Sequence, residues 1–111
     1  MNTRKITENY VRWACEHQQC TFSGDHRKGN KYADKLEKYN RLFVNEYDES
    51  VREMIYIIVE SNNPGAVMWI ASVCKKHQYR LPEVKEKVIS YSKDTKLGLY
   101  AVTAEILLEQ L

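Results

Sequence analysis

Apolar residues recur along this chain at intervals of three and four, the spacing that places them on one face of an α-helix. The clearest run holds Val51, Met54, Ile55, Ile58 and Val59. No stretch of useful length alternates apolar and polar residues in the manner of a β-strand. The pattern therefore predicts an all-α protein.

Turn and cap signals divide the chain into six expected helices. Only two prolines and four glycines occur, which favours helices over a β-sandwich or barrel. Thr7 is the expected N-cap of the first helix, and Asn63 followed by Pro64 is a typical opening of the fourth. The first two expected helices cover residues 7–22 and 26–46. The third starts after a cap at Asp48 or Ser50 and ends near residue 60, and the fourth covers residues 64–77. The fifth opens at Pro82, and the sixth is capped by Asp94 or Thr95.

Two segments that lie 33 residues apart repeat one pattern. Ser50-Val51-Arg52-Glu53 is echoed by Glu83-Val84-Lys85-Glu86, and the segment 64–71 is echoed by 97–104. A period of this length is typical of stacked helical hairpins, in which each unit buries its apolar face against its neighbours. With an irregular first helix pair as a cap, we expect a single domain over residues 1–111. Its expected architecture is a compact HEAT- or armadillo-like stack of about three antiparallel hairpins.

The composition excludes several classes of protein. Hydrophobic residues make up 43% of the chain and charged residues 29%, a balance that excludes wholesale disorder. No apolar run approaches the roughly 18 residues that a bilayer-spanning helix needs. The polar start of the chain lacks the apolar core of a signal peptide. We therefore expect a cytoplasmic protein that does not contact a membrane.

The three cysteines give no sign of disulfides or of a metal centre. Cys15, Cys20 and Cys74 form an odd set without disulfide spacing, which indicates free thiols. A site built from Cys15, Cys20 and His77 would match no zinc-finger or zinc-ribbon pattern. We expect no metal and no cofactor.

Motifs for catalysis are also missing from the sequence. It contains neither a glycine-rich phosphate loop nor a nucleophile elbow. Cys74 and His77 fall within one helical turn, but a core cysteine beside a solvated histidine is the simpler interpretation. We expect a non-enzymatic protein without catalytic residues.

Charge is unevenly distributed, although the whole chain carries only +2. Residues 42–62 hold one arginine and five carboxylates, a balance of 1 − 5 = −4, together with two tyrosines. Tyrosine among carboxylates on an exposed face is a common composition of protein-binding surfaces. The candidate partner-binding residues are Glu46, Tyr47, Asp48, Glu49, Glu53, Tyr56 and Glu60.

The first third of the chain is basic. Residues 1–41 carry nine Lys and Arg against five Asp and Glu, a balance of 9 − 5 = +4. Arg27, Lys28, Lys31, Lys35 and Lys38 would line one helix and attract phosphates. Carboxylates at positions 25, 34 and 37 interrupt them in the sequence, and no aromatic stacking pattern is evident. We expect a solvated helix face and no direct contact with nucleic acid.

Four segments carry a resemblance to known proteins. They are 22–31 (FSGDHRKGNK), 51–53 (VRE), 69–71 (WIA) and 97–101 (LGLYA). These segments resemble the pattern of a bacterial family of short HEAT-like proteins of uncharacterised function, over about residues 7–111. Proteins of this kind are similar to the immunity proteins of bacterial toxin systems, including contact-dependent growth inhibition.

The resemblance implies an immunity protein that binds and neutralises one cognate toxin in the cytoplasm of the producing cell. Many such toxins are basic nucleases, and an acidic face would block a positively charged substrate cleft. Two alternatives remain open. One is a general protein-binding scaffold of the same fold, and the other is a nucleic-acid-binding module that uses the basic second helix.

Overall fold

A computed structural model describes residues 2–111 and confirms the all-α class. It contains six α-helices and one short 3-10 helix in that part of the chain. These are α1 (Thr3–Ser23), α2 (His26–Asn45), α3 (Glu49–Glu60), α4 (Pro64–His77), α5 (Leu81–Ser92), η1 (Thr95–Leu97) and α6 (Leu99–Leu108).

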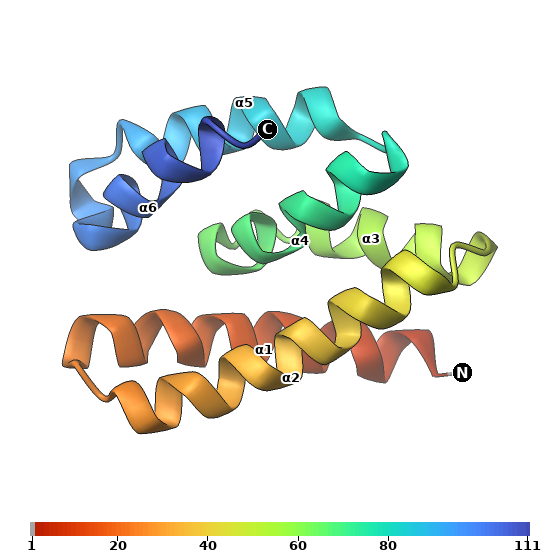
Figure 1. Cartoon of the computed structure of the whole chain (residues 1–111), viewed down its shortest axis with the longest axis horizontal. Helices are drawn as coiled ribbons and strands as arrows, with labels where there is room; N and C mark the ends of the chain where they lie inside the picture. Colours follow the sequence, from red (N-terminus) through yellow and green to blue (C-terminus); the bar gives the residue numbers. More distant parts are fainter. Residues whose placement is uncertain (1) are drawn as a thin grey trace.

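The helices form three hairpins that stack in the order of the sequence. Figure 1 shows α1 and α2 on one side, α3 and α4 in the middle, and α5 and α6 on the other side. The first hairpin packs through α1 against both helices of the second, and α4 packs against α5. The whole measures 36 × 30 × 20 Å. This is the stack of about three hairpins that the 33-residue repeat predicts.

The repeat has the physical basis expected of it. Val51 on α3 and Val84 on α5 are equivalent in the two copies, and both are completely buried. Ala71 on α4 and Ala104 on α6 are likewise equivalent and buried. Small residues at this position let each second helix approach its neighbour closely. These two pairs of repeated positions are therefore core positions.

Helix caps were predicted correctly in the middle of the chain. Asn63 accepts a hydrogen bond from the backbone N–H of Ala66, and Pro64 is the first residue of α4. Asp48 caps α3 in the same way through the N–H of Val51. These caps satisfy N–H groups that a helix start leaves without partners.

Both ends of the chain differ from the expectation. The N-cap of α1 is Asn2, not Thr7, which lies inside the helix and donates its hydroxyl to the carbonyl of Thr3. The last helix begins at Leu99 rather than near Asp94, because Gly98 has φ 54° and ψ −122°, outside helical space. Such backbone angles suit glycine, so the chain forms a 3-10 turn first and then restarts as α6.

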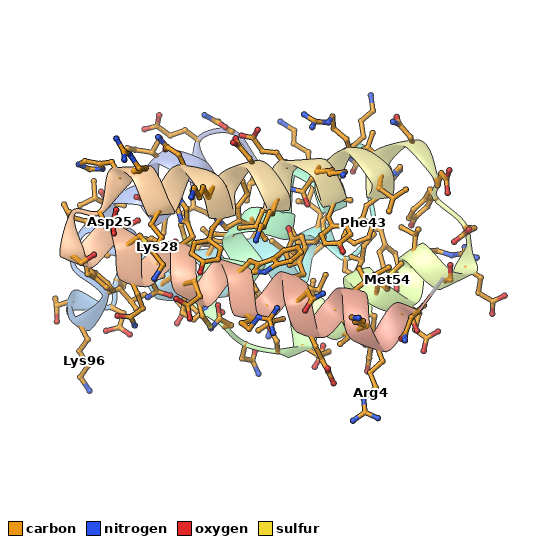
Figure 2. All side chains as sticks on the ribbon, turned by 90° about the horizontal axis from the view of Figure 1, so that it is seen from below. Arg4, Asp25, Lys28, Phe43, Met54 and Lys96 are labelled. Carbon is orange, nitrogen blue, oxygen red and sulfur yellow. The ribbon has the colours of Figure 1, made fainter. Side chains whose placement is uncertain are left out.

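The core lies where the three hairpins meet. Tyr10, Leu36, Phe43, Met54 and Ile70 are among its completely buried side chains. Figure 2 shows Phe43 and Met54 between the helices, whereas Arg4 and Lys96 extend outward. The α1–α4 contact is especially tight, since a Cβ atom added at Gly65 would lie only 3.0 Å from the carbonyl oxygen of Ala14.

Candidate functional site

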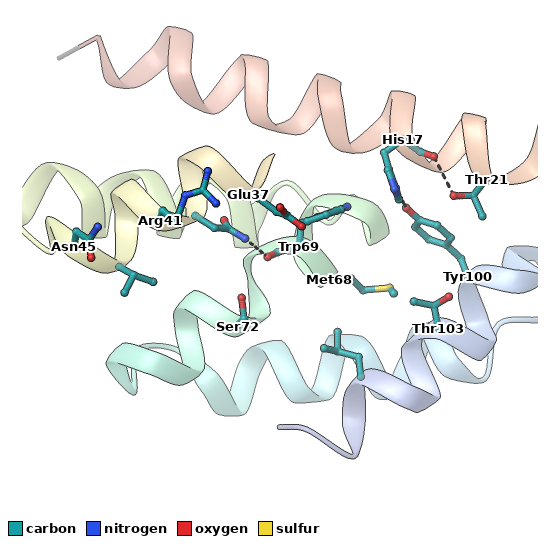
Figure 3. Close-up of a pocket in the computed structure, with 13 residues that line it drawn as sticks. His17, Thr21, Glu37, Arg41, Asn45, Met68, Trp69, Ser72, Tyr100 and Thr103 are labelled. Carbon is teal, nitrogen blue, oxygen red and sulfur yellow. Dashed lines mark hydrogen bonds between the residues drawn. The ribbon is translucent and has the colours of Figure 1, made fainter. Parts of the chain in front are cut away.

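The main concavity is a groove between the first and last hairpins, with α4 as its floor. It has a volume of about 710 Å³ (Figure 3). Four helices contribute to it, so it exists only in the folded chain. The lining residues are His17, Thr21, Glu37, Asn40, Arg41, Val44, Asn45, Met68, Trp69, Ser72, Tyr100, Thr103 and Leu107.

The floor and one wall of this groove are apolar. Met68 and Trp69 come from α4, and Tyr100 and Leu107 come from α6. The α2 rim is polar, and Glu37 and Arg41 project there one helical turn apart (Figure 3). An apolar floor with a few polar groups along its edge is the usual form of a ligand or partner site.

The apolar surface continues from the groove onto the outer face of α6. Thr103 lines the groove and is exposed, and beside it Leu99, Val102 and Ile106 are 63%, 51% and 56% exposed. These three side chains are spaced three and four residues apart, so they lie on one helical face. An exposed apolar row of this kind is uncommon on a helix of a small protein and makes this face a candidate contact surface.

A polar network fixes the floor of the groove. The Tyr10 hydroxyl donates to Asn40 Oδ1 at 2.8 Å, and Asn40 Nδ2 donates to the carbonyl of Trp69 at 2.9 Å. Tyr10 is completely buried, and this burial raises the pKa of its hydroxyl well above the ordinary value, so the hydroxyl stays a donor. The network ties α1, α2 and α4 together under the groove.

His17 and Tyr100 form a polar pair at one end of the groove. A 3.1 Å hydrogen bond joins His17 Nδ1 and the Tyr100 hydroxyl, and the His17 ring meets Trp69 edge-on with 5.3 Å between ring centres. Burial lowers the pKa of His17 and raises the pKa of Tyr100 to about 12. Both groups are therefore neutral at pH 7.

His17 is expected to titrate below its ordinary pKa of 6.5. The unfolded chain then binds this proton first, so the contribution of His17 to stability falls as the pH drops from 6.5 through the folded-state value. An NMR titration of the His17 ring protons measures the pKa directly. Replacing Tyr100→Ala opens the site to water and should move the pKa back towards 6.5. A His17 pKa that is already at or above 6.5 in the wild-type protein would contradict this burial.

Two threonine hydroxyls of the groove are bonded within their own helices. Thr21 donates its hydroxyl to the carbonyl of His17 within α1, and Thr103 donates to the carbonyl of Leu99 within α6. Each of these hydroxyls is used by the backbone of its own helix.

The predicted acidic residues lie elsewhere, at the α2–α3 connection and along α3. Glu49, Glu53, Tyr56 and Glu60 are spaced four, three and four residues apart and are all exposed. They form one stripe, which we call the α3 stripe. Tyr56 is 50% exposed, as a contact residue would be. These four residues of the predicted set therefore share one exposed face.

Other members of the predicted acidic set have structural partners. Tyr47 is half-buried and stacks on the His77 ring with 3.8 Å between ring centres. Asp48 is the α3 cap, and its hydrogen bonds to the Val51 N–H and the Ser50 side chain lower its pKa. Glu46 is exposed at the end of α2. Tyr47 and Asp48 thus hold the connection in place.

The far end of the α3 stripe is neutralised by Arg80. Its guanidinium pairs with Glu60 at 2.6 Å and also with Glu83, and it lies 4.4 Å from the centre of the Tyr56 ring. The negative charge of the stripe is therefore concentrated at Glu49 and Glu53.

The cysteines and the histidine weighed in the sequence each have structural surroundings of their own. His77 Nε2 donates to the carbonyl of Phe43, while Cys74 is buried and burial raises its pKa to about 12. Cys15 accepts a hydrogen bond from Asn63. Among residues 2–111, no three His, Cys, Asp or Glu side chains gather as they would around a metal ion.

The groove could not be found from sequence because its lining is spread over residues 17–107. Trp69 gave a partial signal, since it falls at the edge of the apolar face of its helix. The exposed apolar face of α6 was present in the run Leu99–Leu108, which contains only two polar residues, Thr103 and Glu105. No pattern in one helix indicates that four helices meet around a hollow.

Comparisons with protein-family models, with curated proteins and with solved structures find no match to this chain. Across residues 2–111, every helix is too short or too polar to cross a membrane. The function is therefore argued from the surfaces described above.

Proposed function

We propose that this protein is a protein-binding module and that the groove between α2 and α6 is its principal binding surface. The observation that carries the proposal is the continuity of the apolar groove wall with the exposed apolar face of α6. Together they make one apolar surface, in which the groove is the concave part and the outer face of α6 is the convex part. Such a surface fits a protein segment better than a small molecule, which would be enclosed.

The occupant best suited to the groove is an amphipathic helix of the partner. An α-helix is roughly 10 Å across, and two or three of its turns present a row of apolar side chains to a groove of this kind. Glu37 and Arg41 on the α2 rim form no ion pair with any described residue of this chain. They would pair with charged side chains on either side of the apolar row of the partner helix, and this pairing would fix the direction in which that helix lies in the groove.

The toxin-neutralising role is the narrower form of this proposal. It rests on the family resemblance and on the α3 stripe, where Glu49 and Glu53 are exposed and the charge is not balanced by Arg80. An immunity protein would use the groove or the stripe, or both, to occupy the active site of a basic toxin in the cytoplasm. A scaffold without a toxin partner would use the groove alone.

Two sets of substitutions separate these surfaces once a partner has been captured from cells of the source organism. Thr103→Arg places a large charge in the groove, and we expect it to weaken partner binding at least thirtyfold, measured by calorimetry. Thr95→Arg is the matched control, since Thr95 is exposed at the other end of the last hairpin. Equal affinity for the Thr103 variant and the wild type would reject the groove.

The second set tests the α3 stripe. Glu49→Lys with Glu53→Lys reverses its charge without removing the Asp48 cap. A basic toxin held by this face should lose affinity by about tenfold or more, with the loss mainly in the association rate. Unchanged association kinetics would show that the stripe plays no part, and the toxin-blocking mechanism would then fail even if the groove still binds.

A further inference from the structure

We infer that the outer face of the first hairpin is a second binding site, for single-stranded nucleic acid. It is separate from the groove and from the α3 stripe, and it does not depend on the protein-binding role. The site is a hollow of about 450 Å³ at the beginning of α2. Its lining residues are Asp25, Arg27, Lys28, Lys31, Tyr32 and Lys35.

The fold arranges the cations of α2 as a continuous stripe. Arg27, Lys31, Lys35 and Lys38 follow one another at spacings of four, four and three residues, which is one helical face. Lys28 lies beside them and points over the seam between α1 and α2 (Figure 2). The stripe is roughly 16 Å long at 1.5 Å per residue, enough for a few consecutive phosphates.

The carboxylates that interrupt these cations in the sequence lie in different places. Glu37 faces the groove. Asp34 is a helical neighbour of Lys31 and Lys38, three and four residues away, but does not line the hollow. Asp25 is the one carboxylate in the hollow, and it accepts the backbone N–H of Lys28 as the α2 cap. Four cations and one carboxylate leave the hollow a balance of 4 − 1 = +3.

Aromatic rings accompany the cations, although no such pattern is evident in the sequence. Trp13 from α1 stacks on Tyr39 from α2 with 5.3 Å between ring centres, and both are partly buried against the core. The ammonium of Lys35 lies 5.1 Å from the Trp13 ring centre and 5.6 Å from that of Tyr32. Tyr32 lines the hollow and is partly exposed.

A row of cations beside partly exposed aromatic rings is the arrangement that binds single strands without regard to sequence. The phosphates follow the cations and the bases stack on the rings. An inorganic polyanion or an acidic protein would use the cations alone. Tyr32 is the residue that distinguishes nucleic acid from these other partners, because it lines the same hollow as the cations.

Fluorescence anisotropy of a labelled oligothymidine of about 12 nucleotides tests the site on the full chain. We expect a Kd between roughly 10⁻⁶ and 10⁻⁴ M. The logarithm of the affinity should fall with the logarithm of the salt concentration with a slope of about −3, as four phosphate contacts on a single strand predict. Lys28→Gln with Lys31→Gln should reduce the slope to about half. Lys93→Gln with Lys96→Gln removes two exposed lysines from the last hairpin and should leave it unchanged.

The tyrosine provides the second readout. Tyr32→Leu should weaken binding about tenfold without changing the salt slope, and Tyr32→Phe should restore it, because stacking needs the ring and not the hydroxyl. Inorganic polyphosphate that competes equally well, with no effect of Tyr32→Leu, would overturn the assignment to nucleic acid. Absence of salt-dependent binding at low salt would overturn the site itself.

Discussion

Phe43→Ala is expected to lower the free energy of unfolding by about 3–5 kcal/mol, the cost of removing a large buried aromatic side chain. Phe43 is completely buried at the end of α2, where its ring lies 5.9 Å from that of Tyr10 and 6.2 Å from that of Tyr39. Its removal leaves a cavity between the first two hairpins. Urea unfolding followed by circular dichroism measures the loss.

The second phenylalanine of the chain is a matched control. Phe22 is 48% exposed, and its ring centre lies 6.0 Å from that of Tyr100. Phe22→Ala should cost about 1 kcal/mol, because much of its ring remains in water in the folded state. Similar losses for the two variants would mean that the junction of the first two hairpins is not a closed core.

Asn40→Ala is expected to cost about 2–4 kcal/mol, because it breaks two hydrogen bonds at once. The buried Tyr10 hydroxyl loses its acceptor, and the Trp69 carbonyl loses a donor. A buried donor left without a partner pays its full desolvation cost. Thermal or urea unfolding of Asn40→Ala, compared with the wild type, measures the total loss in the free energy of unfolding.

A double-mutant cycle isolates the hydrogen bond to Tyr10. Tyr10→Phe removes the hydroxyl, so Asn40→Ala made in that background no longer strands a buried donor. We expect the two substitutions together to cost about 1–2 kcal/mol less than the sum of the single costs. Additive costs would show that the two side chains do not interact across the first hairpin.

The hairpin stack follows closely from the sequence because its signals are local and repeated. The apolar spacing of Val51 to Val59 and the Asn63-Pro64 cap each determine one element, and the repeat fixes which elements are equivalent. The errors lie where local signals compete. Thr7 is a good cap residue, but Asn2 caps the helix instead, so α1 begins earlier in the chain than predicted.

The surfaces are harder to predict from the sequence than the helices, because sequence order does not give the direction of a side chain relative to other helices. Tyr47 falls in an acidic segment but stacks inward on His77, and Glu60 is paired by Arg80, which lies twenty residues further along. Of the carboxylates that interrupt the basic residues of α2, Glu37 faces the groove, whereas Asp34 neighbours Lys31 and Lys38 on the helix. Pairing between distant segments decides the charge of each face.

The three candidate surfaces occupy different parts of the stack. The groove needs all three hairpins, the α3 stripe lies on the middle one, and the basic hollow lies on the first one (Figure 1). This separation lets a substitution in one leave the others intact. It also means that binding at one face does not exclude binding at another.

The most direct test of the account places a photo-crosslinking amino acid at Thr103, at Glu53 or at Ser90, each exposed and each on a different helix. After irradiation in cells of the source organism, mass spectrometry identifies what is attached. We predict that the Thr103 site captures one protein partner in high yield and that Thr103 crosslinks to a helical segment of it, while Ser90 captures none. Capture through Glu53 with none through Thr103 would contradict the central role of the groove.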